Sequence, residues 1–160
     1  MYQISTHVIP LICEKNDKDS EYAKIFIKKN ICLNNSLISF KQLFNYENID
    51  EKISNILHIV IYKLPYNCLN FKINNYLKLV SIANGITKNK DIVIINDKLS
   101  NFDENIYKFI KIVLIANMAI WKSKKSYYYI VKLNKTISVY FDKKKWDLIL
   151  EKIKLWANDF

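Results

Sequence analysis

The feature that most constrains the fold of this chain is its shortage of backbone breakers: 160 residues contain one glycine and two prolines. Glycine supplies the conformations that tight turns and phosphate-cradling loops need, so a single glycine excludes a dinucleotide-binding turn and a glycine-rich phosphate loop. With 51% hydrophobic residues, the chain is also unlike disordered, collagen-like or linker-rich classes. We therefore expect one compact domain over residues 1–160, with short loops.

Hydrophobic periodicity predicts strands and helices in mixed order. Alternating or unbroken apolar runs predict strands at Tyr2–Ile12, Tyr22–Lys28 and Asp91–Asn96. Spacings of three and four predict helices, and these are residues 36–44, 48–64, 73–84 and 101–122, with a last helix that follows Asp142. The pattern predicts an α+β fold, predominantly helical, with a small antiparallel sheet and a C-terminal hairpin–helix unit.

Three local features set the expected element ends. Gly85 is expected to end the third helix in the left-handed conformation. Asn101 and Glu104 have the spacing of a capping box at the start of the next helix. Strands Tyr127–Leu133 and Thr136–Phe141 are expected to form a hairpin around Asn134-Lys135.

Part of the chain resembles a known family. The apolar segments Ser39–Phe44, Ile56–Leu64 and Tyr76–Asn84 resemble the order of helical signatures in BTB/Skp1-type adaptor domains. The resemblance covers under half of the chain and implies a helical adaptor. The residues after Gly85 depart from it because they predict a strand.

The residues that commonly carry catalysis are sparse. His7 and His58 have Ile9 and Val60 two positions on, where two-histidine phosphoesterases have a hydroxyl residue, and neither histidine comes with a nucleophile elbow. We therefore expect no catalytic residues, no cofactor and no metal site. A third alternative is an enzyme whose site is assembled from His7, Asp91 or Asp97, although two aspartates at the ends of one strand need a further ligand to hold a metal ion.

The cysteines and the apolar runs of the sequence indicate in which cellular compartment the protein is expected. The three cysteines show no C-x-x-C spacing, which favours reduced thiols over a disulfide framework or a zinc site. Residues 112–121 form the longest uncharged apolar stretch, about half of a bilayer span. No signal peptide is visible. We expect an intracellular, cytoplasmic protein that is not in a membrane.

Lysine supplies all 25 residues of the Lys and Arg class, and the chain has a net charge of +10. Isoleucine, lysine and asparagine have codons rich in A and T, so the gene is AT-rich, as in a virus, a mobile element or an AT-rich microbe. A lysine cluster can therefore arise from codon usage alone. Without arginine, bidentate base recognition is not expected, whereas nonspecific binding of nucleic acid remains open.

Charge concentrates between Trp121 and Trp146, where eight lysines stand against one acidic residue. The expected hairpin places Tyr127, Tyr129 and Tyr140 on the face away from the core. The candidate partner-binding residues are these tyrosines with Lys122, Lys124, Lys125, Lys135, Lys143, Lys144 and Lys145. Tyrosines among lysines suit contacts to an acidic protein surface or stacking on bases beside a phosphate backbone.

These observations predict a small non-catalytic protein that acts by binding another protein with an acidic surface, as an inhibitor, adaptor or immunity-type factor. The alternative is a nonspecific nucleic-acid-binding accessory protein that uses the basic hairpin 121–146. The outward tyrosines could equally pair with a second copy of the chain in a homodimer.

Overall fold

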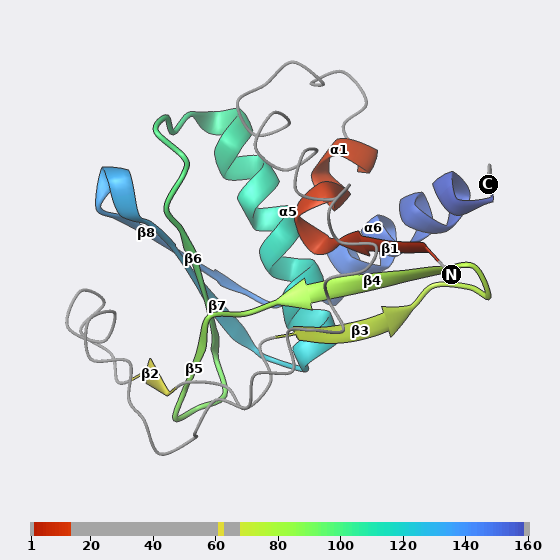
Figure 1. The fold of residues 1–160 in the computed structure, drawn as a ribbon, viewed down its shortest axis with the longest axis horizontal. Helices are drawn as coiled ribbons and strands as arrows, with labels where there is room; N and C mark the ends of the chain where they lie inside the picture. The colour runs from red at the N-terminus through yellow and green to blue at the C-terminus, as the bar shows by residue number, and fades with distance from the viewer. Residues whose placement is uncertain (1, 14–60, 63–67, 159–160) are drawn as a thin grey trace.

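The computed structural model describes residues 2–13, 61–62 and 68–158. These residues form two β-sheets with helices packed beside them (Figure 1). The elements in chain order are β1 Tyr2–Ser5, the 3-10 helix η1 Thr6–Val8, α1 Ile9–Cys13, β2 Ile61–Tyr62, β3 Cys68–Lys72, β4 Leu77–Ile82, β5 Gly85–Thr87, β6 Ile92–Asn96, α5 Glu104–Trp121, β7 Lys125–Ile130, the 3-10 helix η2 Val131–Leu133, β8 Lys135–Tyr140 and α6 Lys143–Ala157.

Both sheets mix parallel and antiparallel pairs. In the three-stranded sheet, of order β1-β4-β3, β4 pairs parallel with β1 and antiparallel with β3. In the five-stranded sheet, of order β2-β5-β6-β7-β8, the β6–β7 pair is parallel and the other pairs are antiparallel. Only Ala83 and Asn84 separate β4 from β5, so the chain passes from one sheet directly into the other.

The parallel β6–β7 pair requires a crossover, which α5 supplies. Ile110 and Leu114 of this helix are fully buried, and they belong to one core cluster with Ile92, Tyr128 and Ile130 of the sheet. Figure 1 shows α5 running beside both sheets, with α1 and α6 next to it. The helix is therefore the central core element, as its apolar sequence predicts.

A buried polar network fixes the C-terminal half of α5 against β4. The Ser81 hydroxyl donates to Asn117 Oδ1 at 2.5 Å and accepts a bond from Trp121 Nε1 at 2.8 Å. Ser81 and Asn117 are both fully buried. Because a buried polar group without a partner is costly, these bonds specify how the helix and the strand meet.

The expected helix over residues 73–84 is wrong. This segment contains the β3–β4 turn and then strand β4, and the apolar side chains of Leu77, Leu79 and Val80 are buried. Strand β4 has buried side chains at both odd and even positions, so its short apolar run resembles that of a buried helix. Gly85 does not end a helix in the left-handed conformation; it begins β5 and pairs with Val93. The adaptor resemblance fails over this segment for the same reason.

The strand predicted over Tyr2–Ile12 forms only in its first part. Strand β1 ends at Ser5, whose side chain accepts a bond from the His7 N–H at 3.2 Å and caps η1. Pro10 then lies in the first turn of α1, where its missing N–H costs no helical hydrogen bond.

The strand at 91–96 and the helix at 101–122 are confirmed as β6 and α5, but the cap of α5 is Asp103 instead of Asn101. Asp103 Oδ1 accepts a bond from the Ile106 N–H at 2.8 Å. The last helix is confirmed as α6 with Asp142 as its N-cap.

The predicted hairpin forms, but with another register. Tyr128 pairs with Ile137 and Ile130 with Lys135, so residues 131–134 make the turn in place of the two-residue Asn134-Lys135. The shift is an even number of residues, so Tyr128, Ile130 and Ile137 still face the core as expected.

Mixed α and β content is confirmed, whereas a predominantly helical fold with only a small antiparallel sheet is wrong. The strand expected at 22–28 and the helix expected at 36–44 lie outside the described residues, as do Cys32 and His58. Of the helix expected at 48–64, the structure describes only residues 61–62, and there the prediction is wrong, because they form strand β2 and pair with β5.

Candidate functional site

A cavity of about 350 Å³ lies where the end of α5, the start of β7 and the start of α6 meet. We call this cavity the lysine pocket. Its lining residues are Met118, Ala119, Lys122, Ser123, Lys124, Phe141, Lys143 and Trp146. Three of the predicted partner-binding lysines are therefore brought to one cavity.

Backbone contacts fix the walls of the lysine pocket. Lys122 ends α5 in the left-handed conformation, at φ 56°, which turns the chain into β7. The N–H groups of Lys122 and Ser123 both donate to Met118 O, and the Phe141 N–H donates to Lys124 O at 2.9 Å. The turn after α5 and the turn before α6 are thus held to each other.

The lysine pocket has an apolar floor and a cationic rim. Met118 is 1% exposed and Trp146 is 7% exposed, whereas Lys122, Lys124 and Lys143 are exposed. None of the described residues that line the cavity is a carboxylate. The nearest acidic residue in the sequence, Asp142, accepts a bond from the Lys145 N–H at 3.2 Å as the cap of α6. The rim therefore carries three positive charges, a setting for an anion.

Lys125 joins two of the predicted tyrosines. Its Nζ lies 4.9 Å from the ring centroid of Tyr127 and 5.1 Å from that of Tyr140. A hydrogen bond with Tyr127 raises the pKa of Lys125 above its ordinary value, and attraction to Tyr127 and Tyr140 adds to this. Lys125 stays protonated at neutral pH, next to the exposed ring of Tyr140.

The other predicted residues are not gathered at this place. Tyr129 is 5% exposed, packs with Val93 and donates to Asn134 Oδ1 at 2.9 Å, so the expectation that it faces outward is wrong. Lys135 lies at the other end of the hairpin, with its Nζ 4.3 Å from the ring centroid of Phe102. Lys144 and Lys145 are exposed in the first turn of α6 but do not line the cavity.

The fold keeps the two aspartates of the alternative enzyme site apart. Asp91 and Asp97 stand at opposite ends of β6, six residues or about 20 Å apart, too far to share a metal ion. His7 lies in η1, with its ring centroid 6.5 Å from that of Tyr128 and its Nδ1 3.3 Å from Ser5 Oγ. Among the described residues, no three His, Cys, Asp or Glu side chains come together in a way that could hold a metal ion.

Sequence reasoning missed the apolar lining of the lysine pocket. Met118, Phe141 and Trp146 are apolar residues within predicted helices and a predicted strand, so none of them was among the candidate binding residues. Phe141 and Lys143 flank the predicted cap Asp142, and this aromatic–cap–lysine order was the available signal. The sequence order does not reveal that the end of α5 lies beside the turn that contains Phe141 and Lys143.

The acidic protein partner and the homodimer remain predictions.

None of the described helices has the length and apolarity needed to cross a bilayer.

No protein-family model matches this chain, and no curated protein matches it. Among solved structures, it is similar to the alkaline exonuclease LHK-Exo from Laribacter hongkongensis, with a TM-score of 0.53 and 7% identity over 98% of this chain and 87% of that one. The same exonuclease in complex with dAMP gives a TM-score of 0.54 at 7% identity, over 98% of this chain and 86% of that one. The structure of SSO0001 gives a TM-score of 0.49 at 10% identity, over 96% of this chain and 74% of that one.

The fold likeness overturns two expectations. A non-catalytic protein that acts as an inhibitor, adaptor or immunity-type factor, or as a nonspecific nucleic-acid-binding accessory, was expected from the lack of catalytic motifs. The chain instead shares the fold of an exonuclease over nearly its whole length. Short motifs were a poor guide here because the likeness lies in the order of strands and helices, at 7% identity.

Proposed function

We propose that this protein is a nuclease that hydrolyses phosphodiester bonds of nucleic acid. The observation that carries the proposal is the fold likeness to an alkaline exonuclease, which extends over 98% of this chain. The net charge of +10 supports the same reading, because a protein that acts on a polyanion gains affinity and association rate from positive charge.

The lysine pocket supports the proposal on the substrate side. A nuclease must hold a polyanionic strand, and cationic side chains that contact the phosphates supply much of that binding energy. Lys122, Lys124 and Lys143 offer three cationic groups on one cavity. Their role in the proposal is to bind substrate, and none of them is assigned a step in bond cleavage.

The test is incubation of the purified protein with end-labelled linear DNA, as single strand and as duplex, and with RNA of the same sequence. Each substrate is tested with Mg²⁺, with Mn²⁺ and with EDTA at alkaline and neutral pH. We expect progressive shortening of at least one substrate, which a mock preparation from cells without the gene does not produce. Intact substrates in every arm, with a protein that shows one cooperative thermal unfolding transition, would overturn the proposal.

A triple substitution Lys122/Lys124/Lys143→Gln links the activity to this chain. We expect it to raise the KM for the cleaved substrate, because three charges on one cavity are removed. Equal cleavage by the wild type, the variant and the mock preparation would show that the cleavage comes from a contaminant.

A further inference from the structure

The lysine pocket has a cationic surface and an apolar surface, which would bind different parts of one ligand. Its rim carries Lys122, Lys124 and Lys143, and its apolar lining consists of the buried Met118 and Trp146 and the partly exposed Phe141. An inorganic anion would use the rim alone, and an uncharged apolar ligand would use the floor alone. A ligand that satisfies both has a flat apolar part joined to an anion.

We propose that the lysine pocket holds one nucleotide unit of a single-stranded nucleic acid, with its base against Phe141 and its phosphate among the three lysines. This inference rests on the proposed function, because it names the form of nucleic acid that the protein binds. A base that is paired and stacked inside a duplex cannot enter a cavity of this kind, whereas a base of a single strand is free to do so.

The aromatic contact is available at the mouth of the lysine pocket. Phe141 is 36% exposed, so part of its side chain is accessible to a ligand, whereas Trp146 is 7% exposed. The volume of about 350 Å³ falls within the range of small-molecule pockets, about 300–1,000 Å³. Aromatic rings beside a basic track are the usual means of binding single strands without reading their sequence.

The neighbouring surface continues the basic track. Lys125 directly follows Lys124 and lies against the exposed ring of Tyr140, and Lys144 and Lys145 directly follow Lys143 on α6. A strand that places one nucleotide in the lysine pocket therefore has further cations for its adjacent phosphates. The absence of arginine from the chain fits binding by charge and stacking instead of bidentate base recognition.

The test measures binding separately from cleavage. Fluorescence anisotropy is recorded in EDTA with three probes of equal length: a single-stranded oligonucleotide, its duplex, and an abasic strand that keeps the phosphates. Gel analysis after each titration verifies that the probes are intact. We expect the single strand to bind at least tenfold more tightly than the duplex or the abasic strand.

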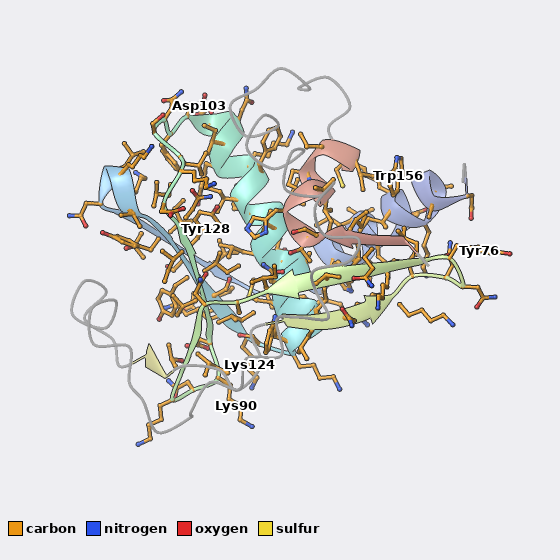
Figure 2. All side chains as sticks on the ribbon, viewed as in Figure 1. Tyr76, Lys90, Asp103, Lys124, Tyr128 and Trp156 are labelled. Atoms are coloured by element: carbon orange, nitrogen blue, oxygen red, sulfur yellow. The ribbon has the colours of Figure 1, made fainter. Side chains whose placement is uncertain are left out.

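Two variants with matched controls locate the site. Phe141→Ala should weaken binding of the single strand about tenfold and leave the abasic strand unchanged. Its control is Tyr76→Ala, because Tyr76 is an exposed aromatic residue far from Lys124 (Figure 2). The variant Lys122/Lys124/Lys143→Gln should weaken both strands and lower the slope of log K against log salt by about 2. Its control, Lys90/Lys152/Lys154→Gln, removes the same charge from exposed positions that do not line the pocket.

Three results would overturn the inference: duplex binding as tight as single-strand binding, no effect of Phe141→Ala, or equal weakening by the two lysine triples. If Phe141→Ala does not fold, Phe141→Leu replaces it, because leucine keeps the apolar volume without the ring. A protein that cleaves nucleic acid but fails these binding tests keeps the proposed function and loses the pocket assignment. A protein that passes them without cleaving any substrate loses the proposed function alone.

Discussion

At the scale of single residues, one side chain decides where the longest described helix begins. Two residues are candidates for the N-cap of α5. Asn101 has the capping-box spacing to Glu104, and Asp103 directly precedes Glu104. In the structure Asp103 Oδ1 accepts the bond from the Ile106 N–H at 2.8 Å (Figure 2 labels Asp103 at the start of α5). The carboxylate thus satisfies one of the unpaired amides of the first turn and adds a favourable charge there.

We therefore predict that Asp103→Ala lowers the free energy of unfolding by about 1 kcal/mol, the usual cost of a lost N-cap. Asn101→Ala, at an exposed position two residues earlier, should change it by less than about 0.5 kcal/mol. Urea unfolding of both variants measures the two values. Equal losses would show that Asn101 shares the cap.

At the scale of elements, α6 carries an unfavourable arrangement of charge. Its first three residues are Lys143, Lys144 and Lys145, although the N-terminal end of a helix favours negative charge. Only the cap Asp142 has the favourable sign. A lysine triplet that costs helix stability is consistent with selection for binding an anion, and also with lysine-rich codon usage.

We predict that Lys145→Glu stabilises the protein by about 0.3–1 kcal/mol, because it places an acid at the third helical position, where it completes a capping pattern with Asp142. Lys152→Glu makes the same charge change at an exposed position in the middle of α6 and is the control. Thermal unfolding at low ionic strength compares them, and added salt should shrink the difference. A loss of stability in Lys145→Glu would contradict the dipole argument.

At the scale of the whole molecule, the buried hydroxyl of Tyr128 links folding to pH. Tyr128 is fully buried in the main core, and its hydroxyl accepts a bond from Asn96 Nδ2 at 2.9 Å, which joins β7 to the end of β6. Burial raises the pKa of Tyr128 far above its ordinary value, and the bond from Asn96 opposes this only in part. The folded protein therefore keeps the Tyr128 proton at a pH where the unfolded chain releases it.

The sign of the pH effect follows from that difference. The contribution of Tyr128 to stability is fully present below the pKa of a free tyrosine, about 10, and is lost as the pH rises above it, by up to about 1.4 kcal/mol per pH unit. In Tyr128→Phe, the free energy of unfolding should fall less steeply above about pH 10, because the unfolded variant has one fewer proton to release than the wild type. Below that pH it should cost about 1–3 kcal/mol, because the Asn96 amide loses its buried partner. Urea unfolding at a series of pH values measures both effects, and an unchanged slope would contradict the assignment.

The sequence by itself determined the elements whose signals are local. The cap before α6, the long apolar run of α5 and the short strand β6 were predicted close to their observed ends, because a cap, a helical stripe and a bounded apolar run each act over a few residues. The core face of the hairpin was also predicted, since it depends only on the alternation of side chains. The cluster of Lys122, Lys124 and Lys143 was visible as a charge pattern.

Tertiary structure decided what local patterns leave ambiguous. Residues 77–82 became a strand because β3 pairs with one of their edges and β1, which stands about 70 residues earlier in the sequence, pairs with the other. Tyr129 is buried although it lies on the predicted outer face, in a small apolar cluster with Val93 and Ile95 of β6. The lysine pocket exists only because the end of α5 and the start of α6 meet at the Phe141–Lys124 hydrogen bond. Such contacts depend on chain segments far apart in the sequence, which periodicity and spacing do not encode.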